Sequence, residues 1–196
     1  MTAEPGAPAG IDIRPLTLAR WPDLEVLFGP RGACAGCWCM YWVLPAAAFR
    51  AQAGAGTHAA LAGRVTRGEV PGLLGYVDGE PAAWCAVEPR AQYERLDRSR
   101  VLAPVDAAPV WAVPCFFVGR RFRRRGLSLA LLRAAVAHAG AHGARIVEGY
   151  PVEPRGETMP PVFAWTGFVS TFRQAGFVEV ARRSPTRPIM RYTVTP

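Results

Sequence analysis

The chain has 196 residues, of which 51% are hydrophobic and 19% are charged, and its formal net charge is +8. This composition excludes an intrinsically disordered chain, and the length suffices for one domain with a full hydrophobic core. No run of 18 apolar residues occurs, so we expect no membrane helix. The first ten residues lack the basic start and apolar centre of a signal peptide, so a cytoplasmic location is the expectation.

The basic character of the chain comes entirely from arginine, because the sequence contains no lysine. A net positive charge suits an anionic partner, either a small phosphate-bearing molecule or a nucleic acid. Five arginines gather in residues 120–125, whereas the others are scattered, and no nucleic-acid-binding motif occurs. We therefore do not expect nucleic acid as the partner.

The first half of the chain predicts a tail, two helices and three strands. Residues 1–10 are rich in Ala, Gly and Pro and should form a flexible tail ahead of a single domain over residues 11–196. The strands are expected at Ile11–Leu16, Gly72–Val77 and Pro81–Val87, and the helices at Thr17–Phe28 and Pro45–Arg64. Asp78-Gly79 is a turn sequence that favours a hairpin between the second and third strands.

A segment rich in cysteine and aromatic residues lies between the two helices, at residues 31–42. It contains Cys34, Cys37 and Cys39 beside two tryptophans, a tyrosine and a methionine. Cys34-x-x-Cys37 has zinc-site spacing but lacks a matching second pair, so we expect no metal. Two further interpretations are a reactive thiol at Cys37 or Cys39, which needs a depressed pKa, and ordinary packed core.

The second half of the chain predicts four strands, two helices and two loops. The strands are expected at Val110–Val118, Arg145–Tyr150, Phe177–Arg182 and Ile189–Val194. One helix should follow Gly126 and stop at Gly140 and Gly143, and the other should span Phe168–Gln174. The loops are expected at Glu88–Ala108, with one helical turn at Gln92–Leu96, and at Pro151–Pro161.

The most informative stretch runs from Val110 to His142 and predicts a strand, a tight turn and a helix. The strand is almost wholly apolar, as in a strand buried on both faces, although Pro114 removes one ladder donor. The first amides of a helix have no intrahelical partner, and Gly126 lets the backbone approach a ligand closely. With five neighbouring arginines, this turn is a natural phosphate site. The alternative is an ordinary turn with a solvated basic face.

Val118, four residues, and then Arg123-x-x-Gly126-x-Ser128 resemble the acetyl-CoA signature of the GNAT superfamily of N-acetyltransferases. Ser128 departs from the pattern, because Gly or Ala is usual there. Residues 166–177 also resemble a GNAT helix that ends in Gly-Phe, here Gly176-Phe177. Two motifs in the right order, about 50 residues apart, are more specific than either alone.

The resemblance implies an α/β (α+β) fold and acetyl-CoA as cosubstrate. The expected sheet is mixed and mostly antiparallel, with about six or seven strands, about four flanking helices and a splay between strands 4 and 5. The pantetheine arm should bond the fourth-strand backbone, and the pyrophosphate should bind the turn. The implied CoA-binding residues are Phe116, Phe117, Val118, Arg123, Arg124, Arg125, Gly126, Leu127 and Ser128. The segment between the first two helices should wall the acceptor site, with Trp38, Tyr41 and Trp42 as its residues.

The expected chemistry is direct attack of a primary amine on the thioester in a ternary complex, with a fourth-strand N–H holding the developing oxyanion. Many GNAT enzymes carry an acidic tyrosine four residues before the Gly-Phe, but Phe172 stands there in this chain. Glu148 and Tyr150 are the candidate catalytic residues, and Asp106, Tyr41 and water are further proton carriers. A covalent route through Cys115 is disfavoured, because cysteines in apolar strands are usually inert.

Three functional hypotheses follow from the sequence. The first is a GNAT-like N-acetyltransferase acting on a small primary amine, and the alternative is an acyl-CoA-binding module of the same fold without transferase activity. The missing tyrosine favours the alternative mildly. A nucleic-acid or regulatory partner rests only on charge and predicts steeply salt-dependent binding. The sequence leaves the acceptor and a homodimer open.

Overall fold

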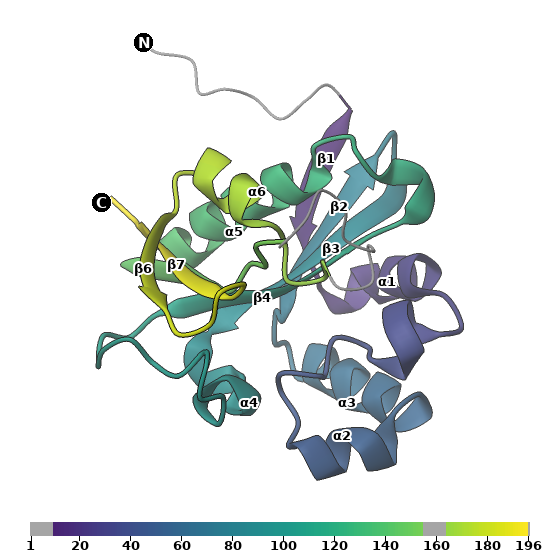
Figure 1. Ribbon diagram of the computed structural model, residues 1–196. Coiled ribbons are helices and arrows are strands. Elements are labelled where there is room, and N and C mark those ends of the chain that lie inside the picture. Colours follow the sequence, from purple (N-terminus) through teal and green to yellow (C-terminus); the bar gives the residue numbers. More distant parts are fainter. Residues whose placement is uncertain (1–9, 155–163, 196) are drawn as a thin grey trace.

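The computed structural model describes residues 10–154 and 164–195, and its centre is a seven-stranded sheet (Figure 1). The strand order is β1-β2-β3-β4-β5-β7-β6, in which β4 and β5 pair in parallel and every other pair is antiparallel. The strands are β1 Ile11–Pro15, β2 Gly72–Val77, β3 Glu80–Pro89, β4 Trp111–Val118, β5 Ile146–Gly149, β6 Val178–Arg182 and β7 Pro188–Thr193. This mixed α/β architecture confirms the predicted fold class.

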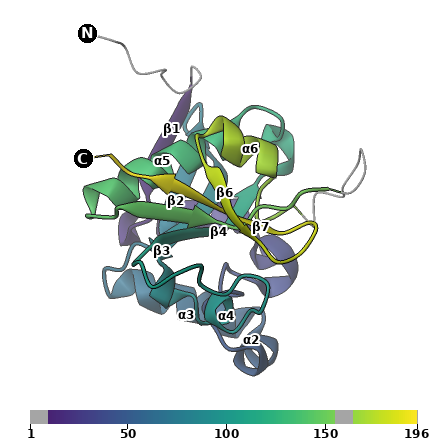
Figure 2. The same ribbon diagram turned by 60° about the vertical axis from the view of Figure 1, so that its left-hand side comes forward.

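Helices cover both faces of the sheet. They are α1 Trp21–Phe28, α2 Ala46–Gln52, α3 Ala55–Thr66, α4 Glu94–Asp97, α5 Leu127–Ala141 and α6 Val169–Gln174. Figure 2 shows α5 and α6 on one side of the sheet and α2, α3 and α4 on the other. Each side therefore has a core of its own, because the central strands are apolar on both faces.

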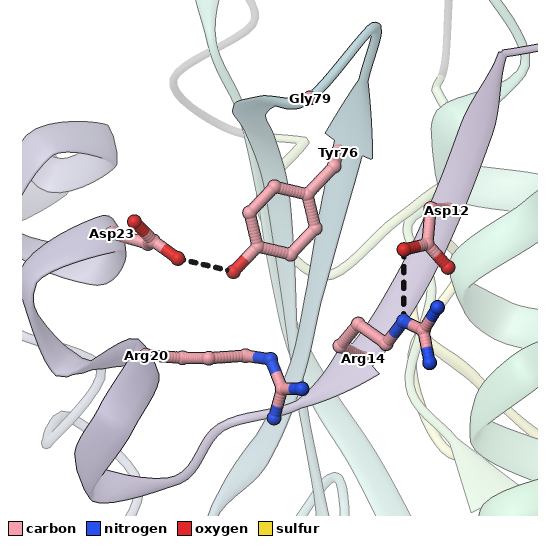
Figure 3. A pocket seen from close by; sticks show the side chains of 6 residues that line it. All are labelled: Asp12, Arg14, Arg20, Asp23, Tyr76 and Gly79. Atoms are coloured by element: carbon pink, nitrogen blue, oxygen red, sulfur yellow. Dashed lines mark hydrogen bonds and ion pairs between the residues drawn. The ribbon is translucent and has the colours of Figure 1, made fainter.

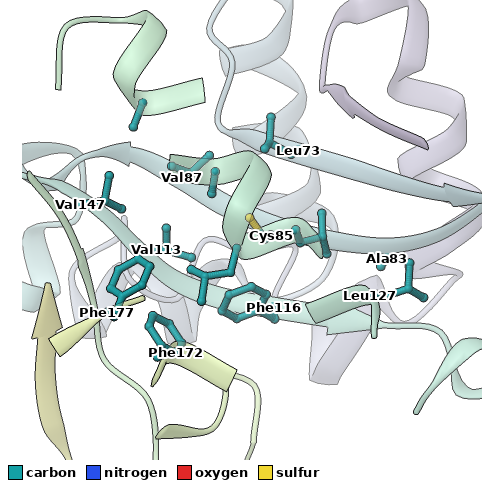
Figure 4. Packing of buried hydrophobic residues seen from close by; sticks show 14 of the residues in the cluster. Leu73, Ala83, Cys85, Val87, Val113, Phe116, Leu127, Val147, Phe172 and Phe177 are labelled. Atoms are coloured by element: carbon teal, nitrogen blue, oxygen red, sulfur yellow. The ribbon is translucent and has the colours of Figure 1, made fainter. Parts of the chain in front are cut away.

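The core on the α5 side joins the sheet to α5 and α6. Val113 and Phe116 of β4 pack there with Leu127 of α5 and Phe172 of α6, all at most 5% exposed (Figure 4). The core on the other side contains Phe28, Trp84 and most of the aromatic segment. The two cores hold β4 from both faces, so the strand that should contact the cofactor is fixed in position.

The predicted helices differ from the structure at three boundaries. The first predicted helix begins as a single 3-10 turn at Leu18–Arg20, and α1 starts at Trp21 because Pro22 fits only a helix's first turn. The second predicted helix is in fact α2 and α3. Gly54 separates these two helices with φ of 95°, a left-handed conformation that an α-helix cannot contain.

The third difference concerns α5, which continues through Gly140 and ends at Ala141. Gly143 has φ of 83° and follows the helix as its left-handed residue. The predicted loop at 88–108 is shorter than expected, because β3 continues to Pro89. The single helical turn predicted within this loop is in fact a 3-10 turn at Arg90–Gln92 followed by α4. The predicted tail and most of the predicted loop at 151–161 lie outside the described residues.

The splay between β4 and β5 begins at Pro114. The two strands pair only from Trp111 to Val113, opposite Val147 to Gly149, although β4 continues to Val118. Pro114 has no N–H to donate, so the ladder loses a bond where the strands part. The predicted splay is therefore confirmed, and it leaves an edge of β4 open toward β5.

Gly149, the last residue of β5, is required by close packing. A Cβ at this position would overlap the ring of Phe172, which is fully buried. We expect Gly149→Ala to lower the free energy of unfolding by about 1–3 kcal/mol, as overpacking does. Gly75→Ala in β2 is the control, because its Cβ would meet neighbours only at 3.5 Å or beyond. Urea unfolding measures the stability of both variants, and equal losses would contradict the close packing proposed at Gly149.

Candidate active site

The turn between β4 and α5 presents free backbone amides. Gly126 caps α5 in a left-handed conformation with φ of 78°, and Arg124 before it has φ of 62°. Leu129 and Ala130 both donate their N–H groups to the Gly126 carbonyl. Within the described residues, the N–H groups of Leu127 and Ser128 have no partner. The amides and the helix dipole at this end of a 15-residue helix are the features that favour binding of an anion.

The arginines of the turn differ in their partners. Arg121 is paired with Glu80 and lies over the Phe122 ring, so a carboxylate of this chain already neutralises its charge. Arg123 is exposed, and its Nε donates to the Val118 carbonyl at 3.3 Å. No carboxylate among the described residues pairs with Arg123, Arg124 or Arg125. Three arginines of the turn thus have no counterion among the described residues.

The open edge of β4 leads directly to this turn. The Phe116 N–H points into the splay, where it donates to the Trp165 carbonyl at 2.6 Å. Backbone direction alternates along a strand, so the Val118 amide faces the splay as well, whereas Phe117 faces β3. The Phe117 side chain packs against Phe28 at 5.5 Å. Of the three predicted strand residues, Phe116 and Val118 therefore present their backbone to the splay.

Two of the three predicted acceptor residues lie beside the same part of β4. The Trp42 Nε1 donates to the Pro114 carbonyl at 3.1 Å. Trp165, whose carbonyl covers the Phe116 amide, packs on Tyr41 and Trp42 with ring centroids 5.1 and 5.5 Å away. Sequence reasoning missed Trp165, because it follows a proline-rich stretch with no pattern that places it against a strand. The structure thus forms an aromatic wall from Tyr41, Trp42 and Trp165 at the splay.

Trp38, the third predicted acceptor residue, lies apart from this wall. Its ring packs on His58 at 4.3 Å, and His58 is 2.8 Å from the Glu25 carboxylate. These three residues line a cavity of about 510 Å³ beside α1. The structure therefore does not bring Trp38 together with Tyr41 and Trp42 at β4.

Comparison with known proteins identifies the family of this chain. Residues 37–155 match the family model of the acetyltransferase (GNAT) family. The chain belongs to the GNAT family. The match contains β4, the splay and the turn, which are the features described above. No curated protein matches the chain in sequence.

Solved structures support the GNAT fold. A GNAT-family protein from Desulfovibrio desulfuricans has 15% identity and a TM-score of 0.54, covering 94% of this chain and 99% of that one. A GNAT-family acetyltransferase from Streptococcus agalactiae has 14% identity and a TM-score of 0.56, covering 96% and 98%. The PaiA N-acetyltransferase of Thermoplasma acidophilum, solved with coenzyme A, has 12% identity and a TM-score of 0.53, covering 94% and 99%.

The predicted catalytic pair of this GNAT chain lies in a buried charge network. Glu148 is 1% exposed and forms ion pairs with Arg90 at 3.0 Å and Arg191 at 2.8 Å. The Tyr150 hydroxyl donates to Glu148 at 2.8 Å and accepts from Arg90 at 2.6 Å. Burial, and then the Glu148 charge, raise the pKa of Tyr150 well above its usual range. All polar atoms of this pair are thus satisfied within the chain.

The other proton carriers considered from the sequence differ in accessibility. Asp106 is exposed and accepts two hydrogen bonds from Arg191, which lower the pKa of its carboxyl. Phe172, at the place of the familiar GNAT tyrosine, is fully buried against Phe116 and Phe177. This position therefore provides core packing and has no proton to give.

The cysteines of the aromatic segment do not form a metal site. Among residues 10–154 and 164–195, no group of three or more His, Cys, Asp or Glu side chains could hold a metal ion. The buried Cys39 thiol accepts from Trp84 Nε1 at 3.1 Å. Burial raises the pKa of the Cys37 thiol to about 11, whereas Cys34 is exposed. This environment favours packing over a reactive thiol.

The rate of alkylation would distinguish a packed thiol from a reactive one. At neutral pH we expect iodoacetamide to modify Cys34 rapidly and Cys37 only after unfolding, because the thiolate is the nucleophile. Peptide mass mapping after a short pulse measures both sites. Modification of Cys37 as fast as that of Cys34 would show a reactive thiol instead.

A second cavity, of about 550 Å³, lies at the β1–β2 edge of the sheet (Figure 3). Its polar groups have partners within the chain: Arg14 donates to Asp12 at 2.8 Å, the Tyr76 hydroxyl to Asp23 at 2.6 Å, and Arg20 to the Pro15 carbonyl at 3.3 Å. We therefore assign it no chemistry.

No helix among the described residues is both long enough and apolar enough to span a membrane.

Proposed function

We propose that this GNAT protein transfers an acetyl group from acetyl-CoA to a primary amine by direct attack in a ternary complex. One observation carries the proposal: the edge of β4 that is unpaired with β5 leads into the free amides of the α5 turn. A strand edge can bond an extended amide-containing chain, and a helix N-terminus binds phosphate. Pantetheine and pyrophosphate have this chemistry in this order.

The turn residues Arg123–Ser128 would hold the pyrophosphate. The space around Gly126 supports this fit, because a Cβ there would meet no atom within 4 Å. The amides of Leu127 and Ser128 would donate to phosphate oxygens, and Arg123, Arg124 and Arg125 would add charge. The Val118 backbone would then bond the pantetheine arm as it enters the splay.

The Phe116 amide is our candidate for the oxyanion donor. It now donates to the Trp165 carbonyl at 2.6 Å, so the acetyl oxygen would take the place of that carbonyl. Such an exchange keeps the amide bonded before and after cofactor binding. Tyr41 and Trp42 would border the thioester from the acceptor side.

Glu148 and Tyr150 stay proposed proton-handling residues, and their contacts point to an indirect role. Both are buried and bonded to Arg90, so a proton reaching them from the amine would have to pass through water or Asp106. Water can carry the protons itself, because holding the amine against the thioester supplies most of the acceleration. Tyr150→Phe distinguishes a proton-carrying role of Tyr150 from a packing role, because it removes the hydroxyl proton but changes little of the packing.

The test is an acetylation assay with purified protein, acetyl-CoA and a panel of primary amines. We expect CoA release that depends on one class of amine and a product heavier by one acetyl group, read by mass spectrometry. CoA release without any acetylated amine would mean hydrolysis only and would contradict transfer.

One observation favours the alternative, an acyl-CoA-binding module without activity. Phe172 is fully buried and has no proton to give, so the family's usual acid is missing. That module would bind acetyl-CoA yet acetylate no amine in the panel. Phe172→Tyr would then not restore activity, because the ring is fully buried in the core on the α5 side.

A further inference from the structure

Arg187 is partly buried, and no carboxylate among the described residues pairs with it. Its Nη1 donates to the Thr166 hydroxyl at 3.1 Å, and this is the one hydrogen bond of the guanidinium to the described part of the chain. A guanidinium has five N–H donors, so most of them remain available to a ligand. By contrast, the buried Arg64 and the partly buried Arg191 are paired with acids.

Burial lowers the pKa of Arg187, and the Tyr41 phenol opposes this effect to a smaller extent. A partly desolvated cation without a counterion is costly, and a bound anion would offset that cost. Arginine is the side chain best suited to grip a carboxylate, because its planar fork matches the two oxygens. The site thus has the chemistry of an anion receptor.

The position of Arg187 ties this receptor to the transfer site. Its partner Thr166 directly follows Trp165, whose carbonyl covers the Phe116 amide of β4. Tyr41 packs on Trp165 at 5.1 Å from the other side. A ligand held by Arg187 would therefore lie beside the aromatic wall, one residue along the chain from Trp165, whose carbonyl accepts from the proposed oxyanion donor.

A second arginine supports the same side of the site. The Arg95 guanidinium lies 3.8 Å from the centre of the Tyr41 ring, and its Nη1 donates to the Tyr41 carbonyl at 3.1 Å. No carboxylate in the described residues pairs with it, since the neighbouring acids Glu94 and Asp97 are taken by Arg98 and Arg90. Arg95 thus fixes Tyr41 and adds a second positive charge near the wall.

From these contacts we propose that Arg187 binds a carboxylate of the acceptor, so that the acceptor is an α-amino acid with an apolar side chain. An α-amino acid has its amine and carboxylate on one carbon, so a carboxylate at Arg187 brings the amine to the splay. The apolar side chain would pack on Tyr41 and Trp165, with Arg95 as a positioning residue behind Tyr41. This inference rests on the proposed function and specifies its substrate class.

Matched pairs of amines test the inference. L-Phenylalanine and phenethylamine share a ring and a primary amine, and leucine and isopentylamine share a branched chain, but only the amino acids have a carboxylate. We expect a kcat/KM at least about tenfold higher for the amino acid in each pair. Arg187→Gln should abolish that preference by raising KM for the amino acids, and Arg187→Lys should keep part of it.

Arg183→Gln is the matched control, because Arg183 lies in the same connection between β6 and β7 but is exposed and bonds the Ala103 and Pro104 carbonyls. It should leave the preference unchanged. Acetylation of phenethylamine and isopentylamine without any preference for the amino acids would overturn the inference while leaving the transferase proposal intact. Acetylation of no amine at all would count against the transferase proposal instead.

Calorimetry of phenylalanine binding to the protein saturated with CoA keeps the inference testable without turnover. Binding by the wild type that Arg187→Gln loses and Arg183→Gln keeps would support the receptor. Equal binding by all three proteins, or none by the wild type, would overturn it.

Discussion

Replacing Glu148 with glutamine is expected to lower the free energy of unfolding by about 3–5 kcal/mol. Glu148 is 1% exposed and is shared by Arg90 and Arg191, whose side chains are 9% and 11% exposed. The amide would keep the shape of the carboxylate but remove the one buried negative charge between two cations. Their remaining acids, Asp97 and Asp106, are about half exposed and cannot replace it.

Urea unfolding of Glu148→Gln beside Glu80→Gln measures this effect. Glu80 is an exposed partner of Arg121, and surface pairs of this kind are worth at most about 1 kcal/mol. A loss for Glu148→Gln no larger than that for Glu80→Gln would contradict the structural role.

Tyr150→Phe adds a functional readout, since a fall in kcat with stability retained would identify Tyr150 as a proton carrier.

Replacing Gly126 with glutamate is expected to weaken acetyl-CoA binding by about 100-fold or more, which corresponds to about 3 kcal/mol. A carboxylate would project into the space proposed for the pyrophosphate, where like charges repel. The φ of 78° at Gly126 also disfavours any side chain, so the turn and its amides would shift. Both effects act on the same anion site.

Gly143→Glu is the control for Gly126→Glu. Gly143 has φ of 83°, is exposed and would place its Cβ in open space, but it lies at the opposite end of α5. It imposes the same charge and a similar backbone strain away from the turn. Calorimetric affinities for acetyl-CoA should therefore differ sharply between the two variants, and equal affinities would place the phosphate site elsewhere.

The sheet and the turn could be predicted from sequence because their signals are local. Asp78 and Gly79 adopt φ of 51° and 81°, the left-handed pair that a two-residue hairpin needs. The apolar run of β4 and the Arg123–Ser128 turn are likewise contiguous in sequence. Periodicity therefore located these elements within a few residues of their observed bounds.

The acceptor side could not be predicted in the same way, because it depends on contacts between distant residues. Trp42 reaches Pro114, Trp165 reaches Phe116, and no periodic pattern marks either partner. Trp38 lies in the same sequence segment as Trp42 but belongs to a different part of the core. Left-handed residues such as Trp38 itself, with φ of 43°, turn the chain there in ways that composition does not reveal.

The buried networks were missed for a related reason. Arg90 and Glu148 are 58 residues apart, and only their pairing across the sheet explains why two charged side chains are buried together. Arg187 has no carboxylate partner among the described residues, and no sequence motif records this.

The most direct test of the account is a calorimetric titration of the protein with acetyl-CoA, CoA and ADP. Because the proposed site holds both pyrophosphate and pantetheine, we expect micromolar affinity for acetyl-CoA and CoA and weaker binding of ADP, which lacks the pantetheine arm. Binding of none of the three would contradict the assignment of the β4 splay and the α5 turn as a coenzyme A site.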